Sequence, residues 1–473
     1  MKKKICLLLA VLALMALPLA ASAAEFTLGG QIEFLTIWDS TQVNANLTRF
    51  VARNNDPDFQ HGRLKFSAER SRLYFLMKGP QIWGAQTTGF IEFDFDNASD
   101  VNTAAGALSY SPQKARLGLR HAFFRLSWPQ TELVMGHYWS LLTEDIPETG
   151  DPGSPLSRAG DPYIREPQIR LTQKCGPWDI SLAVSEPSNG SLGTTLDPSQ
   201  SSVNNNFSGE SSETPKLSGR IKYERDLWGT APYYGKPRGF SARLAAAWQR
   251  SRYRSFSATN ARTWGENDYQ GVSVFQRDQQ YLNQWLVEGS LFIPVIASHT
   301  PNPSGTLSLM TQWYVGAGVD NFAVDQPANS SFLKWQGIDS LQRNVYDREL
   351  MKQYGGFVQG QYWFTEQWYL NAVWGMFKGF GVDRDTDPNA PGGFRFATID
   401  RSSDPVKFNQ NYILTLYYRP IQALKFGLEY AYVRADYFQQ RNTAGNQNAL
   451  TKVGQTADIG ENHRLLFVGY FFF

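Results

Sequence analysis

Charged side chains of opposite sign occupy different stretches of this chain, and this separation is its most suggestive chemistry. Basic side chains stand on the polar face of short alternating segments: Arg70, Arg72, Arg116, Arg120, Arg170, Arg220 and Lys222. Acidic side chains gather in the polar segment 143–164: Glu144, Asp145, Glu148, Asp151 and Asp161. Opposite charges that face each other across a narrow space would orient dipolar solutes and favour one sign of ion. The simpler alternative is that the acids are solvated and the arginines pair with neighbours such as Glu92 and Asp94.

The sequence shows few features that indicate catalysis. The histidines are scattered along the chain, at His61, His121, His137, His299 and His463. A catalytic nucleophile needs a base within hydrogen-bond reach, and no spacing in the sequence indicates such a pair. His121 shares the alternating face of Leu119 and Phe123, so we expect its ring to point to lipid or to an interface between subunits. The sequence therefore predicts no enzyme activity.

The amino terminus has the three parts of a secretory signal peptide. Lysines at positions 2–4 precede the apolar run Ile5–Leu17, and small residues follow at Ala21-Ser22-Ala23. Cleavage after Ala23 removes residues 1–23 and leaves 24–473 as one domain, and a cut after Ala24 is the alternative. The net charge then moves from +2 to −1, which leaves no global basicity to attract nucleic acid.

Metal and cofactor sites are also weakly indicated. The same cleavage removes Cys6 and leaves Cys175 alone, so neither a disulfide nor a Cys-x-x-Cys-His haem motif is possible. The triplet Asp383, Asp385 and Asp387 could hold calcium, but Pro388 follows it where a calcium loop would have glycine. We predict no metal and no cofactor.

The composition excludes a bundle of membrane-spanning helices. The mean hydropathy is −0.39, and the one long apolar run belongs to the signal peptide, whereas such bundles need several runs of about 20 residues. Aromatic residues nevertheless make up 14% of the chain. Charged residues make up 19%, below the ~25% usual for soluble domains.

Alternation of apolar and polar residues dominates the chain after the signal peptide. In the segment 71–78, Leu73, Phe75 and Met77 share one face while Arg72 and Lys78 lie on the other. The same period of two recurs in the segments 89–95, 216–224, 411–419 and 423–432. This period is typical of β-strands that have one apolar and one polar face.

The connections between these segments alternate between short and long. Seven are short and rich in proline and tryptophan, and eight are long and polar, which predicts sixteen strands. Tryptophans recur at four successive short connections: Trp83, Trp128, Trp178 and Trp228. Indole rings favour the interface between membrane and water, so this pattern indicates a belt at one end of a membrane protein.

Two architectures fit sixteen alternating strands, namely soluble sandwiches and a transmembrane barrel. Sandwiches bury their apolar faces against each other, whereas a barrel turns them to lipid and encloses its polar faces. The alternating connections, the tryptophans and the absence of a linker favour an all-β, antiparallel transmembrane barrel. An open sheet edge in lipid would leave backbone groups unpaired, so the first strand, 26–38, should pair with the last, 461–473.

The sequence resembles the bacterial outer-membrane porins. The opening strand Phe26–Ile32 and the segment Ser71–Gly79 resemble the general porins. Leu119–Phe124, followed by Met135–Ser140, is similar to the fourth and fifth strands of DcaP-like porins, with His137-Tyr138 where those carry Gln-Thr.

This resemblance implies a homotrimer of water-filled channels in the Gram-negative outer membrane, in contact with the lipid bilayer and lipopolysaccharide. It also implies that the third long loop, about 143–164, folds inward as a constriction loop. The expected function is passive diffusion of small hydrophilic solutes and ions, with anions or carboxylates favoured by the basic wall. The alternative is a barrel that sheathes a partner protein, such as an outer-membrane cytochrome conduit, or that acts as a surface adhesin. A sheath needs an open lumen, so the third loop distinguishes the two.

Overall fold

The computed structural model describes most of the strand-forming parts of the chain. The described residues are 25–41, 61–95, 117–151, 160–187, 212–258, 274–323, 331–342, 344–380, 389, 396–397, 406–437 and 459–473. The predicted signal peptide, Arg116 and the triplet at positions 383, 385 and 387 lie outside these ranges. None of the described residues forms a helix long and apolar enough to cross a membrane.

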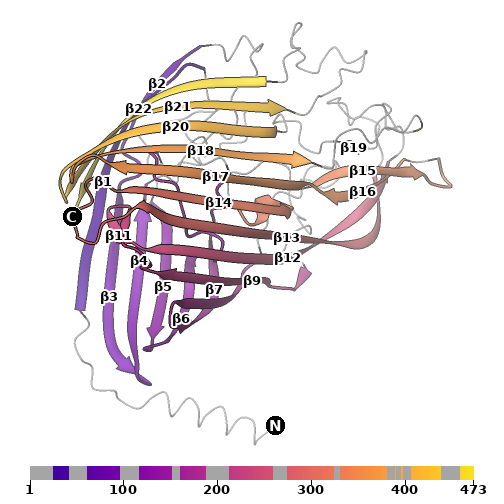
Figure 1. The fold of residues 1–473 in the computed structure, drawn as a ribbon. Coiled ribbons are helices and arrows are strands. Elements are labelled where there is room, and N and C mark those ends of the chain that lie inside the picture. The colour runs from indigo at the N-terminus through magenta and orange to yellow at the C-terminus, as the bar shows by residue number, and fades with distance from the viewer. Residues whose placement is uncertain are drawn as a thin grey trace, which may run out of the picture.

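Sixteen antiparallel barrel strands follow one another in chain order through the described residues (Figure 1). The second barrel strand is interrupted and consists of β2 and β3, which both pair with β1. The strands are β1 (Glu25–Asp39), β2 (Arg63–Ser67) with β3 (Arg72–Ile82), β4 (Ala85–Asp94), β5 (Gly118–Ser127), β6 (Thr131–Trp139), β7 (Arg165–Cys175), β8 (Trp178–Ser185), β9 (Lys216–Arg225), β12 (Phe240–Ala258), β13 (Val274–Ile296), β14 (Leu307–Ala317), β17 (Lys352–Trp363), β18 (Trp368–Phe380), β20 (Val406–Ile421), β21 (Leu424–Tyr437) and β22 (Ile459–Phe472).

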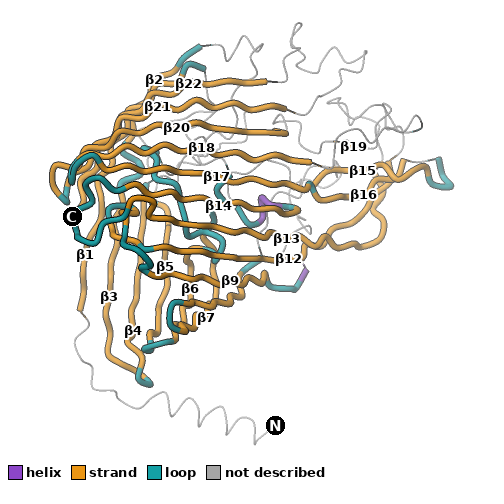
Figure 2. Tube along the Cα trace, in the orientation of Figure 1, coloured by secondary structure: helices purple, strands orange, loops and turns teal. Residues whose placement is uncertain are grey.

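The first and last strands close the barrel. β1 pairs with β22 from Gln31 opposite Phe472 to Asp39 opposite Arg464. Closure gives each edge strand a partner, so the sheet has no open edge to expose to lipid. The predicted all-β barrel, its sixteen strands and its terminal pairing are therefore confirmed. Figure 2 shows that strands make up nearly all of the described trace.

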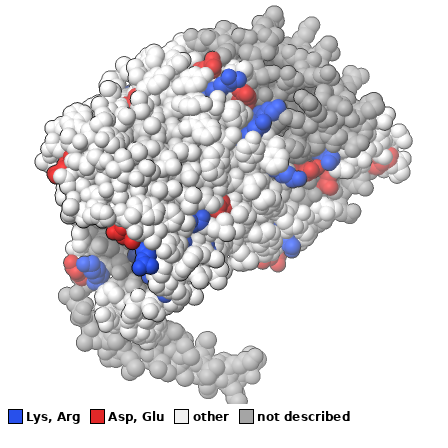
Figure 3. Space-filling view, viewed as in Figure 1, with Lys and Arg blue, Asp and Glu red and all other residues white. Residues whose placement is uncertain are grey.

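The outer face of the barrel is apolar. Outward side chains such as Phe26, Leu182 and Leu428 are 61%, 65% and 60% exposed. The neighbouring inward positions are polar and buried, as at Ser181 and Glu429. Figure 3 shows a broad uncharged surface with charged side chains only in small groups. Such a surface is stable in lipid and would be unfavourable in water.

The tryptophans lie at the short-turn end of the barrel, as the sequence predicts. Trp83, Trp178 and Trp228 are exposed. The Trp128 indole donates to the Trp83 carbonyl over 2.9 Å, and the Trp228 indole donates to the Pro294 carbonyl over 2.7 Å. The indoles therefore combine an apolar ring with a satisfied N–H group, which suits a membrane interface.

Several short elements lie outside the sixteen barrel strands. β15 (Ser331–Ile338) and β16 (Asn344–Leu350) form a hairpin that pairs with the end of β12, and β19 (Phe396–Ala397) pairs with β15. A short 3₁₀ helix, Val319–Asn321, follows β14. β10 (Ala231–Tyr233) and β11 (Lys236–Arg238) form a separate two-stranded hairpin between β9 and β12.

The expected orientation of His121 is wrong. Glu92 pairs with His121 and Phe93 pairs with Leu119, so Arg120 is the extra residue of a β-bulge. The His121 ring is 5% exposed and lies 3.7 Å from the Glu92 carboxylate. The bulge therefore turns His121 toward the lumen while Leu119 stays exposed on the outer face.

Candidate functional site in the barrel lumen

The segment 143–164, hereafter the inward loop, lies between β6 and β7, and its described residues, 143–151 and 160–164, lie in the lumen. Its two ends are held together because Ser140 N–H donates to the Ile164 carbonyl over 3.0 Å. Thr143 strengthens this base, since its hydroxyl accepts from Ile164 N–H over 2.9 Å. From this base, residues 144–151 contact inward side chains of successive strands from β9 to β22, and residues 160–164 lead back to β7.

Glu144 fixes the loop to β9. Its carboxylate pairs with both Arg220 and Lys222, with 2.5 Å between Oε1 and the Lys222 ammonium. Burial alone would raise the pKa of the Glu144 carboxyl, but Arg220 and Lys222 outweigh burial and lower it below its ordinary value. Two residues predicted for the basic wall therefore neutralise a residue predicted for the acidic loop.

Asp145 fixes the loop to the β12 side of the lumen. Its carboxylate oxygens lie 2.7 Å from the Arg238 guanidinium and 3.6 Å from that of Arg243. The Ser290 hydroxyl donates to the same carboxylate over 2.5 Å. Burial acts to raise the pKa of Asp145, but the two arginines lower it well below its usual range.

Glu148 fixes the loop to the strands beyond β14. The Tyr369 hydroxyl and the Gln361 amide donate to its carboxylate over 2.7 and 2.8 Å. Lys425 of β21 completes the set with an ion pair of 3.2 Å. The backbone is held as well, because Glu148 N–H donates to the Gln359 side chain over 2.7 Å.

The last described residues of the outward run reach the closure of the barrel. Gly150 N–H donates to the Glu429 carboxylate over 2.5 Å, and the Tyr470 hydroxyl donates to the Gly150 carbonyl over 3.0 Å. Asp151 pairs with Arg70, and its other oxygen lies 3.8 Å from Arg464 of β22. The outward run of the loop is therefore attached to the lumen wall from β9 around to the closure of the barrel.

Asp161 lies on the returning part of the loop and is buried. Gly160 precedes it with a φ of 83° and lies against the backbone of β17 and β18. A Cβ atom at this glycine would lie 2.1 Å from the Gly356 carbonyl oxygen, so no larger residue fits. The loop backbone thus packs directly on the barrel wall here.

These contacts differ from both arrangements considered for the acids. The loop carboxylates neither face the arginines across open space nor lie in free solution. They form buried ion pairs and hydrogen bonds with the wall, and most of their partners were missed by the sequence analysis. Those partners are Arg238, Arg243, Lys425 and Arg464. The available signal was an isolated charge on the polar face of an alternating strand, as at Arg243 between Ala242 and Leu244.

Arginines on the opposite wall, from β3 to β7, have fewer partners. Arg120 pairs with Glu92 over 3.0 Å and also with Asp94, as the simpler alternative predicts. By contrast, some guanidinium N–H groups on this wall are buried without a hydrogen-bond partner in the described part of the chain. They are Nε of Arg72, Nη1 of Arg165 and Nε of Arg170.

Aromatic rings lie beside two of these arginines, Arg165 and Arg170. Arg165 lies 4.8 Å from the ring centre of Trp139 and 5.7 Å from that of Tyr163 on the inward loop. Arg170 lies 4.6 Å from the ring centre of Tyr138. Contacts of this kind stabilise a cation without neutralising its charge. The sequence analysis did not assign a role to Arg165 or to these rings, although Tyr138-Trp139 directly precedes the loop.

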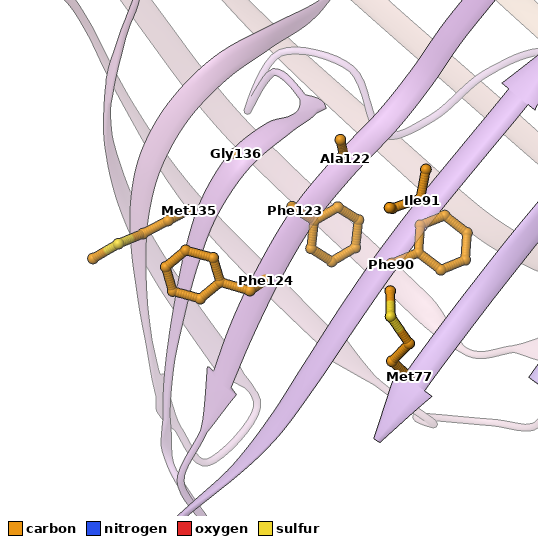
Figure 4. A pocket seen from close by; sticks show the side chains of 8 residues that line it. All are labelled: Met77, Phe90, Ile91, Ala122, Phe123, Phe124, Met135 and Gly136. Carbon is orange, nitrogen blue, oxygen red and sulfur yellow. The ribbon is translucent and has the colours of Figure 1, made fainter. Parts of the chain in front are cut away.

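An apolar hollow of about 390 Å³ lies on the β3–β6 wall. Figure 4 shows its eight lining residues: Met77, Phe90, Ile91, Ala122, Phe123, Phe124, Met135 and Gly136. The lining contains no charged side chain and no polar side-chain group, so the hollow does not suit a hydrophilic solute. The chemistry of the molecule therefore lies in the lumen, between the arginine-bearing wall and the attached loop.

The fold and the lumen together define a membrane-spanning, sixteen-stranded barrel with an inward loop. No family model matches the sequence, and no curated protein matches it. Among solved structures, the outer membrane channel DcaP of Acinetobacter baumannii aligns over 95% of this chain and 98% of its own, with a TM-score of 0.61 and 14% identity. The two chains therefore share a fold along nearly their whole length, and the resemblance to porins is confirmed at the level of the fold.

Two further structures align over most of their length. The anion-selective porin from Comamonas acidovorans covers 95% of this chain and 100% of its own, with a TM-score of 0.45 and 10% identity. The outer membrane protein OmpT of Vibrio cholerae, in its trimer form, covers 96% and 100%, with a TM-score of 0.47 and 8% identity.

Proposed function

We propose that this chain is an outer-membrane channel through which small hydrophilic solutes and ions diffuse passively, with a preference for anions such as carboxylates. A barrel of sixteen strands is too wide for wall side chains alone to fill, so water enters the lumen. The shared fold with a protein described as an outer membrane channel supports the same conclusion.

One observation carries the anion preference. Four loop carboxylates, those of Glu144, Asp145, Glu148 and Asp151, form ion pairs with the wall. By contrast, Nε of Arg72, Nη1 of Arg165 and Nε of Arg170 have no hydrogen-bond partner among the described residues. These arginines keep their positive charge on the lumen wall, so a carboxylate that passes along this wall would be attracted and a cation would be repelled.

The proposal also covers the removal of the signal peptide, the membrane location and the oligomeric state. Residues 1–23 direct export and are removed, and residues 24–473 form the channel, with 143–164 as its constriction loop. The barrel assembles as a homotrimer in contact with lipid and lipopolysaccharide. The apolar hollow on β3–β6 supports a contact of this wall with a neighbouring subunit or with lipid, because either would cover its apolar surface.

The alternatives receive less support from the geometry. A sheath for a partner protein needs a lumen free of the barrel's own chain, but the described parts of the inward loop occupy it. Enzyme activity would need a nucleophile beside a base, and the proposed channel requires no such chemistry.

Planar-bilayer recording of the purified protein tests the proposed function. We expect stepwise conductance, with closing events in multiples of three for a trimer. The same preparation, unfolded by boiling before addition, provides the control. Complete absence of steps from correctly folded barrels would contradict the proposal.

A further inference from the structure

The β10–β11 hairpin folds into the lumen from the short-turn end of the barrel. It belongs to the connection 226–239 between β9 and β12, one of the seven connections that the sequence analysis describes as short. Ala231 of β10 is buried in a cluster with Phe292, Met310 and Phe357, and Tyr233 packs against this cluster. These partners lie on β13, β14 and β17, so the hairpin covers the inner wall instead of extending away from the barrel. Figure 1 places β11 at the same end of the barrel as the carboxyl terminus.

The tip of the hairpin reaches far around the lumen. Tyr234 and Gly235 form a tight turn with φ values of 49° and 74°. A Cβ atom on Gly235 would lie 2.4 Å from Nη1 of Arg419 on β20. β20 is the fifth barrel strand after β12, where the hairpin rejoins the wall. The hairpin therefore crosses part of the opening and does not simply follow its rim.

The hairpin also contacts the inward loop. The Tyr233 hydroxyl accepts from Ile146 N–H over 3.0 Å, and the Tyr234 hydroxyl donates to the Pro147 carbonyl over 3.1 Å. Arg238 at the end of β11 pairs with Asp145 over 2.7 Å. The two elements enter the lumen from opposite ends and meet through these contacts.

The tip remains accessible to water. Tyr234 is 38% exposed, and Gly235, Lys236 and Pro237 are also exposed. An element whose base packs on the wall and whose tip stands in the aqueous opening narrows that opening. Its contacts with the loop also restrict the positions that the loop can adopt.

We propose that the β10–β11 hairpin is a second, size-determining constriction at the short-turn mouth, and that Tyr233 is a positioning residue that joins it to the inward loop. This inference rests on the proposed channel function. It adds a selectivity element that the channel function does not require.

Deletion of Pro232–Pro237 tests the constriction, because it removes the tip together with Tyr233 but keeps Arg238 and its partner Asp145. We expect the single-channel conductance to rise about 1.5-fold. We also expect larger poly(ethylene glycol) molecules to enter from the short-turn side, with little change from the other side. The control deletes Pro301 and Asn302, which are exposed in the connection between β13 and β14, and should leave both readings unchanged.

Tyr233→Phe tests the joining role separately. This variant keeps the ring in its apolar cluster and removes only the hydroxyl. We expect an unchanged polymer size limit but more open-channel current noise, because the loop loses its partner at Ile146. Wild-type noise would show that Tyr233 does not position the loop.

A labelling experiment covers the case in which the deletion variant does not fold. Lys236→Cys is made in a Cys175→Ser background and treated from the short-turn side with a bulky methanethiosulfonate reagent. We expect the conductance to fall, whereas Asn302→Cys in the same background should conduct as before treatment. Unchanged conductance of the labelled Lys236 variant, or of the folded deletion variant, would overturn the constriction. Absence of conductance in the wild-type protein would instead reject the channel function itself.

Discussion

Glu148 on the inward loop and Lys425 on β21 form an ion pair of 3.2 Å on the far side of the lumen from the base of the loop. The pair is buried, since the two side chains are 2% and 12% exposed. It therefore holds the loop across the barrel and uses a carboxylate that would otherwise face permeating ions. Glu144, Asp145 and Asp151 act in the same way.

Breaking this pair should loosen the loop. In Glu148→Gln, Lys425 keeps its charge but loses its buried counter-charge, which typically costs about 3–5 kcal/mol. We expect a lower temperature for the loss of folded-barrel mobility on gels, together with noisier open-channel currents. The exposed pair Lys78–Glu25 supplies the control, because Lys78→Gln should cost less than about 1 kcal/mol.

The double variant Glu148→Gln/Lys425→Gln decides whether the two residues act together. Because each single change already removes the pair, the double variant should lose less stability than the two single variants combined. Additive losses would show that the ion pair does not anchor the loop.

The inward loop should detach from the lumen wall only at low pH. The pKa values of Glu144 and Asp145 are lowered in the folded protein, so both carboxylates stabilise the docked loop above the ordinary values of about 4.3 and 3.9. This stabilisation is lost as the pH falls through the lowered pKa values. The contribution of these two carboxylates to conductance and noise, measured against Glu144→Gln/Asp145→Asn, should therefore stay constant from about pH 8 to pH 5 and change only below about pH 4. A transition centred between pH 5 and pH 7 would contradict this assignment.

A charged side chain on the outer face should destabilise the barrel. Leu182 is 65% exposed on β8 and points to lipid in our account. Leu182→Arg should lower the free energy of unfolding from lipid vesicles by about 2–4 kcal/mol if the residue lies near the middle of the bilayer. Leu182→Val is the matched apolar control. If Leu182→Arg lowers the free energy of unfolding by less than Leu182→Val does, this face does not contact lipid.

Alternation along the chain predicted the fold because each barrel strand has one apolar face. At Tyr412, Leu414 and Leu416, for example, the predicted apolar face is the exposed outer face. The prediction was wrong at His121 because a bulge adds one residue to β5, and a period of two cannot reveal where it is interrupted. The bulge is visible only once β4 and β5 are paired.

The sequence indicated which charged residues belong to the loop and the wall, but not which of them form pairs. Glu148 and Asp145 were recognised as loop acids, yet Lys425 and Arg238 lie far from them in the sequence. The hairpin was missed for a similar reason. Proline and glycine between β9 and β12 indicate a turn, but only the apolar cluster around Phe292 directs that turn into the lumen.

The central claim is that the wall from β3 to β7 favours anions, and the reversal potential in a salt gradient tests it most directly. In an about tenfold potassium chloride gradient, the wild-type channel should give the sign of potential expected for chloride preference. Arg72→Gln/Arg165→Gln should shift this potential toward cations, whereas Lys78→Gln should leave it unchanged. A wild-type potential of the opposite sign, or no shift in the double variant, would contradict the account.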